Sequence, residues 1–455
     1  MIKKTMCELF AGVGGFRLGF DKLNSGWETK WFSQWEPGKK AQWAHNCYVN
    51  HFGDAEDLNG DITTNYDISK VDKMSIPDHN LLVGGFPCQN YSVAASKSSK
   101  GIEGEKGVLW WQIRDTLIAK RAPFVLLENV DRLLKSPASQ RGRDFGIMLT
   151  CMAQLGYRVE WRVINAADYG AAQRRRRIFI FAYDKNTEYA KGMDKVSTEE
   201  IMTKEGFFAS VFPIEDYGVY KFSEVSVCDI SAVKAQTLLT EGIEQADNDL
   251  LEMTQRYSFL FENSGYMIDG KITTYNVCPK KEKPTLLGDI MVDNADSKYF
   301  IDDSRLYYTD CNIKHSDERE NNLPKESRQT WQYLKGGKRR FRTSSAGHSY
   351  IFSEGPIPMV DEWDSPARTM LTSEGSFNRS THIVRDKKSG RIRLITPVEA
   401  ERIQGFDDDW TQQCLVNGKV VDMPERIRFF CMGNALVVPM VTRMGKQLDK
   451  IFSKE

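Results

Sequence analysis

Short apolar segments alternate with helix-like segments through the first 185 residues, and this alternation constrains the fold more than any other feature of the chain. The apolar segments are rich in β-branched and aromatic residues, as strands are. Helical patterns such as those at 38–52 and 108–120 separate them. We expect the strands at residues 5–11, 29–36, 81–86, 124–130, 158–165 and 177–183. Because strands joined through helices form a mainly parallel sheet, the sequence predicts an α/β fold with a doubly wound sheet.

The chain changes character near residue 186 and again near residue 385. Between these points polar residues and glycine are frequent, and strand-like pieces are short, as at 271–278 and 298–308. Beyond them, Thr396-Pro397 marks a helix start, since proline suits the first helical turn. The stretch 433–452 reads as a strand or turn followed by a closing helix. We therefore expect 1–185 to begin a ligand-binding α/β domain, 186–384 to form a smaller loop-rich domain, and 385–455 to return and complete the first domain.

Overall composition excludes some classes of protein. The chain has 62 basic and 62 acidic side chains among 455 residues, which argues against a surface that is basic all over but is compatible with a local basic cleft. No apolar run approaches the roughly 18 residues of a membrane helix, and the N-terminus lacks the pattern of a secretory signal. The nine cysteines include no C-x-x-C pair. This argues against a zinc site or a disulfide framework and favours a reducing cytoplasm.

A glycine-rich turn follows the first expected strand. The run from Phe10 to Gly15 reads F-A-G-V-G-G, and glycines at such a turn let a ligand approach the backbone closely. A dinucleotide fingerprint is weakened because Arg17 occupies the place of its third glycine. Glu36, at the end of the next strand, could accept from two ribose hydroxyls, and Asp61 from an adenine amine. These features predict an adenosine pocket, with a tight turn that binds no ligand as the alternative.

A second candidate site lies where the strand 81–86 ends. The run from Gly84 to Gln89 reads G-G-F-P-C-Q and places Cys88 at the carboxyl end of the sheet, where open α/β folds bind ligands. A lone cysteine is usually a small buried apolar residue. Here the glycines, the proline and the polar residues that follow favour an exposed thiol. Such a thiol becomes a strong nucleophile once it is ionised.

Charged residues mark two later strands. Glu128 ends the strand at 124–130, and in a closed cleft desolvation would favour its neutral form, which can donate a hydrogen bond or a proton. Four consecutive arginines open the strand at 177–183. By β alternation Arg175 and Arg177 share one face, while Arg174 and Arg176 share the other. The alternative for Glu128 is a polar strand end that faces solvent, and the alternative for the arginines is a solvated charged face.

Together these motifs resemble the cytosine-5 DNA methyltransferase family of bacterial or phage type. The family pattern F-x-G-x-G-G, P-C-Q, E-N-V, Q-x-R-x-R and a late G-N occurs here in that order, the last as Gly433-Asn434. The resemblance covers most of 5–185 and again about 365–445. It implies a Rossmann-like core that binds S-adenosylmethionine, releases S-adenosylhomocysteine and needs no metal. It also implies a target-recognition domain at 186–384 and methylation of carbon 5 of a cytosine flipped out of double-stranded DNA.

The resemblance assigns roles to single residues. The Cys88 thiolate would add to cytosine carbon 6, and Glu128 would hydrogen-bond or protonate ring nitrogen 3. Arg175 would contact the base with Arg177 as its supporting partner, and Asn129 would orient the local backbone. The cofactor would lie against Phe10, Ala11, Gly12, Gly14, Gly15, Glu36, Asp61, Ile62, Pro87 and Asn434. The register of the ribose-binding acid stays open, because Glu36 precedes Pro37 where many members have an aromatic or aliphatic residue.

Two segments are candidates for DNA contact. The polar stretch after Cys88 is similar to the family's mobile loop and offers Gln89, Ser92, Lys97 and Lys100. The stretch 335–342, K-G-G-K-R-R-F-R, offers Arg339 and Arg340 to the DNA backbone. A solvated loop and a solvated hairpin are the respective alternatives. We expect a monomer that acts on duplex DNA in the bacterial cytoplasm, without a membrane. A cognate restriction endonuclease could be encoded nearby, with no physical contact implied.

Three other functions were weighed. A eukaryotic branch of the same family methylates tRNA, but it carries a Cys-Phe-Thr signature that is absent here. A catalytically inactive DNA-binding regulator on the same fold would not need Cys88, Glu128 and Arg175 together. A nicotinamide-dependent oxidoreductase is disfavoured by Arg17 and by the lack of a proton-relay motif.

Overall fold

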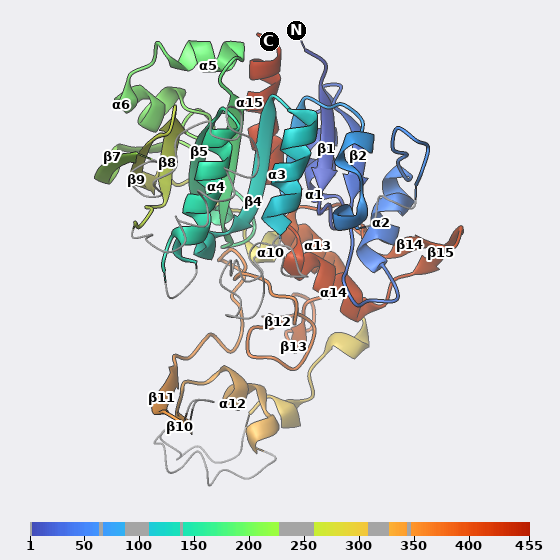
Figure 1. The fold of residues 1–455 in the computed structure, drawn as a ribbon. Coiled ribbons are helices and arrows are strands. Elements are labelled where there is room, and N and C mark those ends of the chain that lie inside the picture. The colour runs from blue at the N-terminus through green and yellow to red at the C-terminus, as the bar shows by residue number, and fades with distance from the viewer. Residues whose placement is uncertain are drawn as a thin grey trace.

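The computed structural model describes residues 2–62, 67–86, 109–136, 140–226, 259–307, 327–343 and 347–455. These residues form a large sheet with helices on both faces, and a smaller lobe projects below it in Figure 1. The described strands of the large sheet run in the order β2-β1-β3-β4-β6-β5-β8-β9-β7.

The first half of this sheet is parallel. Its strands are β2 (Glu28–Ser33), β1 (Thr5–Leu9), β3 (Leu81–Gly85) and β4 (Phe124–Val130). β1 lies between β2 and β3, and β3 pairs in parallel with β4. The chain adds β2 on one side of β1 and then β3 and β4 on the other side. The strand order thus reverses at β1, as in a doubly wound fold. The predicted α/β class is confirmed. β1 ends two residues earlier than expected, because Phe10 and Gly12 adopt positive φ angles of 57° and 58°.

Alternating side chains of the parallel strands build two cores. Leu81 and Val83 join the core on one face, and Leu82 joins the core on the other. The first face is covered by α1 (Gly15–Asp21) and α15 (Val438–Phe452). The second is covered by α3 (Leu109–Lys120) and α4 (Arg143–Gln154). Within the described ranges, no helix combines the length and apolar character needed to cross a membrane.

The second half of the sheet is antiparallel. β6 (Arg176–Asp184) lies antiparallel between β4 and β5 (Tyr157–Asn165). β8 (Ser264–Ile268), β9 (Lys271–Pro279) and β7 (Ile214–Ser226) then continue the sheet. The strand expected at 271–278 is confirmed as β9. The segment 186–384 therefore contributes an extension of the large sheet as well as the small lobe.

One expected strand is wrong. Residues 297–307 form two 3-10 turns, Ser297–Tyr299 and Asp303–Arg305, where a strand was predicted at 298–308. Asp296 and Asp302 accept hydrogen bonds from the backbone N–H groups of Lys298 and Ser304. Such local side-chain bonds offer the backbone an alternative to a strand ladder.

The C-terminal return begins with the predicted helix. α13 (Pro397–Gln404) is capped by Thr396, and Glu399 completes a capping box. Gly433 and Asn434 then end another helix, α14 (Glu425–Asn434), so the expectation of a strand or turn there is wrong. A Cβ on Gly433 would lie 2.4 Å from the main chain of Leu371 and Thr372. This close packing favours glycine inside the helix.

The small lobe has its own apolar cluster, which includes Ile301, Trp331 and Ile383. Its helix is α12 (Trp331–Lys335), and its two small sheets are the hairpin of β10 (Lys338–Thr343) with β11 (Ser349–Glu354) and the pair β12 (Ile383–Arg385) with β13 (Ile392–Leu394). In Figure 1 the β10–β11 hairpin lies at the end of the lobe far from the large sheet, and β12–β13 lies between them.

Candidate active site

The glycine-rich turn leaves the edge of the sheet immediately after β1. The backbone N–H of Ala11 donates to the Ser33 carbonyl at 3.0 Å, and the N–H of Gly12 donates to Gln34 Oε1 at 2.8 Å. A Cβ on Gly12 would meet no atom within 4 Å. The backbone at Gly12 is therefore open to a ligand, as the adenosine-pocket prediction requires.

The other two glycines of the turn are required for packing. Gly14 has a φ of +86°, and a Cβ there would lie 2.6 Å from the Phe52 ring, which belongs to α2 (Trp43–Phe52). A Cβ on Gly15 would lie 3.1 Å from Leu436, which follows α14. These contacts bring α2 and the segment after α14 against the turn.

A buried carboxyl lies beneath the turn. Glu8 of β1 is fully buried and accepts a hydrogen bond from the Tyr48 hydroxyl at 3.1 Å. Burial raises the pKa of Glu8 to about 8, although Tyr48, Arg17 and the N–H groups of Arg17 and Phe16 favour the charged form. The first turn of α1 contains no acidic residue, and the backbone N–H groups of Phe16 and Arg17 at the start of this helix interact with Glu8.

The two acids expected at the adenosine lie in loops after the strand ends. Glu36 is half-buried, three residues beyond β2, and burial raises its pKa while the backbone N–H of Ala44 lowers it. Gln42 bridges the backbone N–H and carbonyl of Glu36 at 2.7 and 3.0 Å, which fixes this turn. Asp61 and Ile62 are exposed, and the Asp61 N–H donates to Asp57 Oδ1 at 3.0 Å.

The strand that leads to the predicted nucleophile ends beside Glu128. Gly85 of β3 pairs with Glu128 of β4, and a Cβ on Gly85 would lie 3.4 Å from Glu128 Oε2. Asn129 Nδ2 donates to the Phe86 carbonyl at 2.9 Å, so this amide holds the backbone at the point where β3 ends. Pro87, Cys88, Gln89, Ser92, Lys97 and Lys100 lie outside the described residues.

Glu128 forms the central charged contact of the site. Its carboxylate accepts from Arg177 Nε at 2.8 Å, and only 9% of the residue is exposed. Burial raises the pKa of Glu128, and the Arg177 and Arg175 guanidinium groups partly offset this rise. Arg176, one position away, instead pairs with Asp131 at the surface. The alternation predicted for the arginine run is present in the structure.

Arg175 is almost completely buried and is held by main-chain carbonyls. Nη1 donates to the Met370 carbonyl and Nη2 to the Gly433 carbonyl, each at 3.0 Å. Burial, reinforced by the charge of Arg177, lowers the pKa of Arg175. Its guanidinium thus joins three distant parts of the chain: the start of β6, the segment near 370 and the end of α14.

Comparison with known proteins identifies the family to which the chain belongs. The family model of C-5 cytosine-specific DNA methylases matches residues 4–450. The chain belongs to this family. Type II methyltransferase M.Sau3AI of Staphylococcus aureus is 44% identical over 457 residues, which cover 100% of this chain and 97% of that protein. M.NgoBI of Neisseria gonorrhoeae is 36% identical over 184 residues, covering 40% of this chain and 51% of that protein.

Solved structures agree on the fold of this DNA methylase. The Dnmt2 methyltransferase of S. pombe superposes with a TM-score of 0.53 at 12% identity and covers 99% of this chain and 100% of its own. Dnmt2 of Spodoptera frugiperda gives the same TM-score at 11% identity, covering 98% and 99%. At such identities the likeness concerns the fold alone.

The remaining predicted residues lie on other elements of the methylase fold. Asn434 is exposed at the end of α14, one residue after the carbonyl that binds Arg175. Arg339 is exposed on β10 in the small lobe. Arg340 is the next residue of that strand, and its side chain lies outside the described part of the chain.

Sequence reasoning missed several groups that hold the site together. Glu8 had a usable signal, since it is the one acid in the buried strand T-M-C-E-L directly before the glycine motif. No sequence signal pointed to Gln34, which fixes Gly12. The same holds for Trp410, whose Nε1 donates to the Val13 carbonyl at 2.8 Å. Their roles depend on contacts between segments that are remote in the sequence.

Proposed function

We propose that this protein methylates carbon 5 of cytosine within a specific sequence of double-stranded DNA, with Cys88 as the nucleophile. The observation that carries the proposal is the buried Glu128–Arg177 pair, which lies over Gly85, three residues before Cys88. A carboxyl whose pKa is raised by burial can offer a proton to a ring nitrogen. The full-length similarity to a type II methyltransferase supports the same function and a restriction-modification context.

The residues of the glycine-rich turn fit S-adenosylmethionine as the methyl donor. The open backbone at Gly12 would accommodate its amino acid part, Glu36 its ribose hydroxyls and Asp61 its adenine amine, with Phe10, Ala11, Ile62, Pro87 and Asn434 completing the pocket. When bound, this cofactor supplies an electrophilic methyl group. The chain's own acids bind and orient it, and no metal ligand is needed for that task.

The chemistry of the base is assigned to Cys88 and Glu128. The thiolate forms a bond to cytosine carbon 6, while Glu128 donates a hydrogen bond or a proton to ring nitrogen 3. Electron density moves to carbon 5, which becomes enamine-like and nucleophilic. After methylation, water takes the carbon 5 proton, the bond between carbon 6 and the Cys88 sulfur breaks to release the thiolate, and ring nitrogen 3 returns its proton to Glu128. The aromatic ring is thereby restored.

We assign the two arginines roles opposite to those that the family resemblance implied. Arg177 contacts Glu128 and would meet the base beside it. The terminal nitrogens of Arg175 are already bonded to the Met370 and Gly433 carbonyls, so it acts as a positioning residue. Each hydrogen bond to a charged group contributes about 1.5–3 kcal/mol, enough to keep the two carbonyls against β6.

The small lobe and the stretch after Cys88 are the proposed DNA-contacting parts. Gln89, Ser92, Lys97 and Lys100 would follow the strand near the flipped base, and Arg339 and Arg340 would contact the duplex further away. We propose that the protein acts as a monomer in the cytoplasm, and that a restriction endonuclease of the same specificity accompanies it without binding to it.

A methyl-transfer assay tests the function directly. The protein is incubated with labelled S-adenosylmethionine and unmethylated plasmid DNA, tRNA or no nucleic acid, followed by nucleoside analysis. We expect labelled 5-methylcytosine in the DNA alone. Label in tRNA would instead support the RNA-methylating alternative. Label in neither would contradict the proposal and favour a catalytically inactive DNA-binding protein.

A further inference from the structure

The β10–β11 hairpin is a two-stranded ribbon whose two faces differ. In its antiparallel register Arg339 pairs with Ser353, Phe341 with Ile351 and Thr343 with Ser349. By β alternation these six residues lie on one face of the ribbon. All six are exposed. We call them the outer face.

The opposite face makes contacts with the lobe at one end of the ribbon. Lys338 pairs with Glu354 at 3.1 Å and donates to the carbonyls of Leu334 and Gly336. Arg342 lies over the Phe352 ring at 3.8 Å. This face therefore attaches one end of the ribbon to its own lobe through Lys338, whereas Arg342 and Tyr350 at the other end are exposed. The outer face makes up the rest of the surface that the ribbon offers to an external partner.

The outer face combines positive charge with exposed apolar groups. Phe341 is 72% exposed and Ile351 is 43% exposed, next to the exposed guanidinium of Arg339. Exposed aromatic and aliphatic side chains that neighbour each other mark interaction surfaces. An arginine beside them indicates an anionic partner, and DNA is the anionic partner that the family provides.

The shape of the ribbon fits one site on DNA. The major groove of B-DNA is about 12 Å wide and admits a two-stranded β-ribbon. There arginine can bind the O6 and N7 of guanine with two hydrogen bonds, and apolar side chains contact the methyl group of thymine. Arg339, Phe341 and Ile351 are residue types suited to these contacts.

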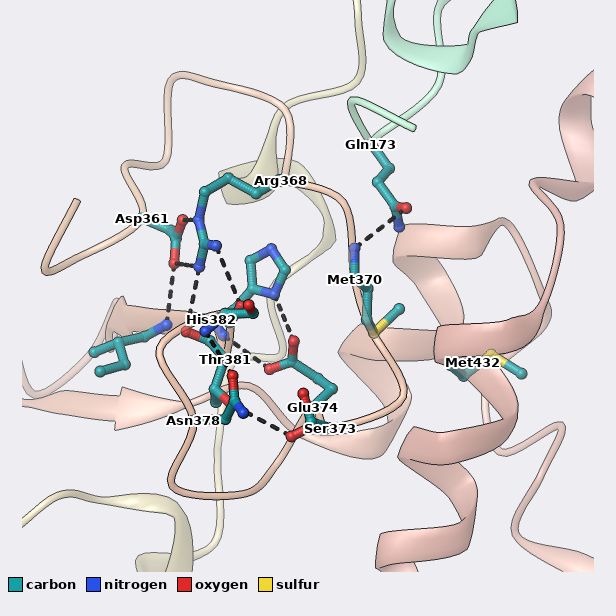
Figure 2. A network of polar contacts seen from close by, with 12 residues as sticks. Gln173, Asp361, Arg368, Met370, Ser373, Glu374, Asn378, Thr381, His382 and Met432 are labelled. Carbon is teal, nitrogen blue, oxygen red and sulfur yellow. Dashed lines mark hydrogen bonds and ion pairs between the residues drawn. The ribbon is translucent and has the colours of Figure 1, made fainter. Parts of the chain in front are cut away.

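A partly buried polar network fixes the ribbon to the rest of the protein. At the end of β11, Glu354 pairs with Arg379 at 2.5 Å, and just before β10, Lys335 donates to the Thr381 carbonyl at 2.8 Å. Arg368 binds Asp361 with two hydrogen bonds and also donates to the Thr381 carbonyl. Figure 2 shows Asp361 and Arg368 beside Thr381 and His382.

The same network continues to the active site. His382 Nδ1 and Glu374 Oε2 are 2.8 Å apart in the buried part of the loop. Two residues after Arg368 in the sequence, the backbone N–H of Met370 is 3.5 Å from Gln173 Oε1, a contact drawn in Figure 2. The Met370 carbonyl accepts from Arg175. Bonded groups thus connect the ribbon with the arginines beside Glu128.

We propose that the outer face of the β10–β11 ribbon enters the major groove and reads base edges on the DNA that flanks the target cytosine. The inference rests on the proposed DNA methylation and goes further, because the sequence indicated only backbone contact for Arg339. Arg339 reads a guanine, and Phe341 with Ile351 contacts a thymine methyl group. The polar network fixes the distance between the bases that are read and the cytosine that is methylated.

The test compares the sequences that variants methylate in plasmid DNA, mapped by bisulfite sequencing. For Arg339→Ala and Arg339→Lys we expect methylation to spread to sites that differ at one base. Loss of a two-bond base contact reduces discrimination about 5- to 150-fold. Lysine keeps the charge and has donors but lacks the rigid planar fork of arginine, so it should restore discrimination only in part. Phe341→Ala should relax a second position and abolish the effect of replacing thymine by uracil there.

Arg342→Ala is the matched control, since it removes the same charge from the other face of the same strand. We expect it to weaken binding to cognate and scrambled duplexes equally, with unchanged specificity. S-adenosylmethionine binding should match the wild type in every variant, and unfolding midpoints should match it in the Arg339 and Phe341 variants. An unchanged set of methylated sites for Arg339→Ala and Phe341→Ala would overturn the inference alone. Absence of methylation by the wild type would overturn the proposed function and this inference with it.

Discussion

Replacing Glu8 by glutamine should make the protein more stable at alkaline pH. Glu8 is fully buried under the glycine-rich turn, and burial raises its pKa from 4.5 to about 8. In the folded protein Glu8 therefore keeps its proton at pH values at which the unfolded chain has already released it. The contribution of the protonated Glu8 to the free energy of unfolding is fully present below pH 4.5, and it is lost as the pH rises through about 8.

The size of the effect follows from this difference. A tenfold change in an equilibrium constant corresponds to about 1.4 kcal/mol, so a rise from 4.5 to about 8 sets an upper limit of about 5 kcal/mol. Glutamine has nearly the same shape, remains neutral and can still accept from the Tyr48 hydroxyl. At pH 9 we expect Glu8→Gln to be about 2 to 5 kcal/mol more stable than the wild type, with little difference at pH 5.

Urea unfolding followed by circular dichroism at pH 5, 7 and 9 measures this difference. Other buried acids, such as Glu160 with a pKa of about 7, affect wild type and variant alike and cancel in the comparison. Glu56→Gln, at an exposed glutamate, is the matched control and should follow the wild type. If the wild type and Glu8→Gln lose stability in parallel between pH 5 and 9, the reasoning about Glu8 is refuted.

Three further predictions concern the site. Cys88→Ser should abolish methylation and leave S-adenosylmethionine binding nearly intact, so retained turnover would exclude Cys88 as the nucleophile. Glu128→Gln should lower kcat about 10²- to 10⁴-fold. It should also remove the decline of wild-type kcat at high pH, where Glu128 loses the proton that its burial retains; a persisting decline would contradict this role. Gly433→Ala should cost about 1–3 kcal/mol or more of stability, because its Cβ would meet the main chain near Leu371. Thermal unfolding against Gly192→Ala, where a Cβ meets nothing within 4 Å, checks the last prediction.

Much of the parallel sheet could be predicted because its signals are local. Runs of apolar residues define β3 and β4 within one residue of the expected bounds. The capped start of α13 is likewise encoded in a few neighbouring residues, Thr396 to Glu399. The identity of the family was also available from the sequence, since five short motifs in a fixed order are specific even when each alone is weak.

Several features depended on contacts between remote segments. β7 to β9 join the large sheet although they follow a change in composition, because strand pairing is decided by backbone partners outside the local sequence. Gly433 lies in a helix on account of its packing against residues 371 and 372.

The sequence by itself determined the fold class and the family and predicted the chemical groups for catalysis, because those depend on residue types and their spacing. Only the tertiary structure decided which partners each of these groups has. It bonded Arg175 to two distant carbonyls and left Arg177 for Glu128, although the two arginines are equivalent in the sequence pattern. It also buried Glu8 and separated the two faces of the β10–β11 ribbon. Burial and side-chain partners arise from segments that meet only in the folded chain, and they set the charge and role of each group.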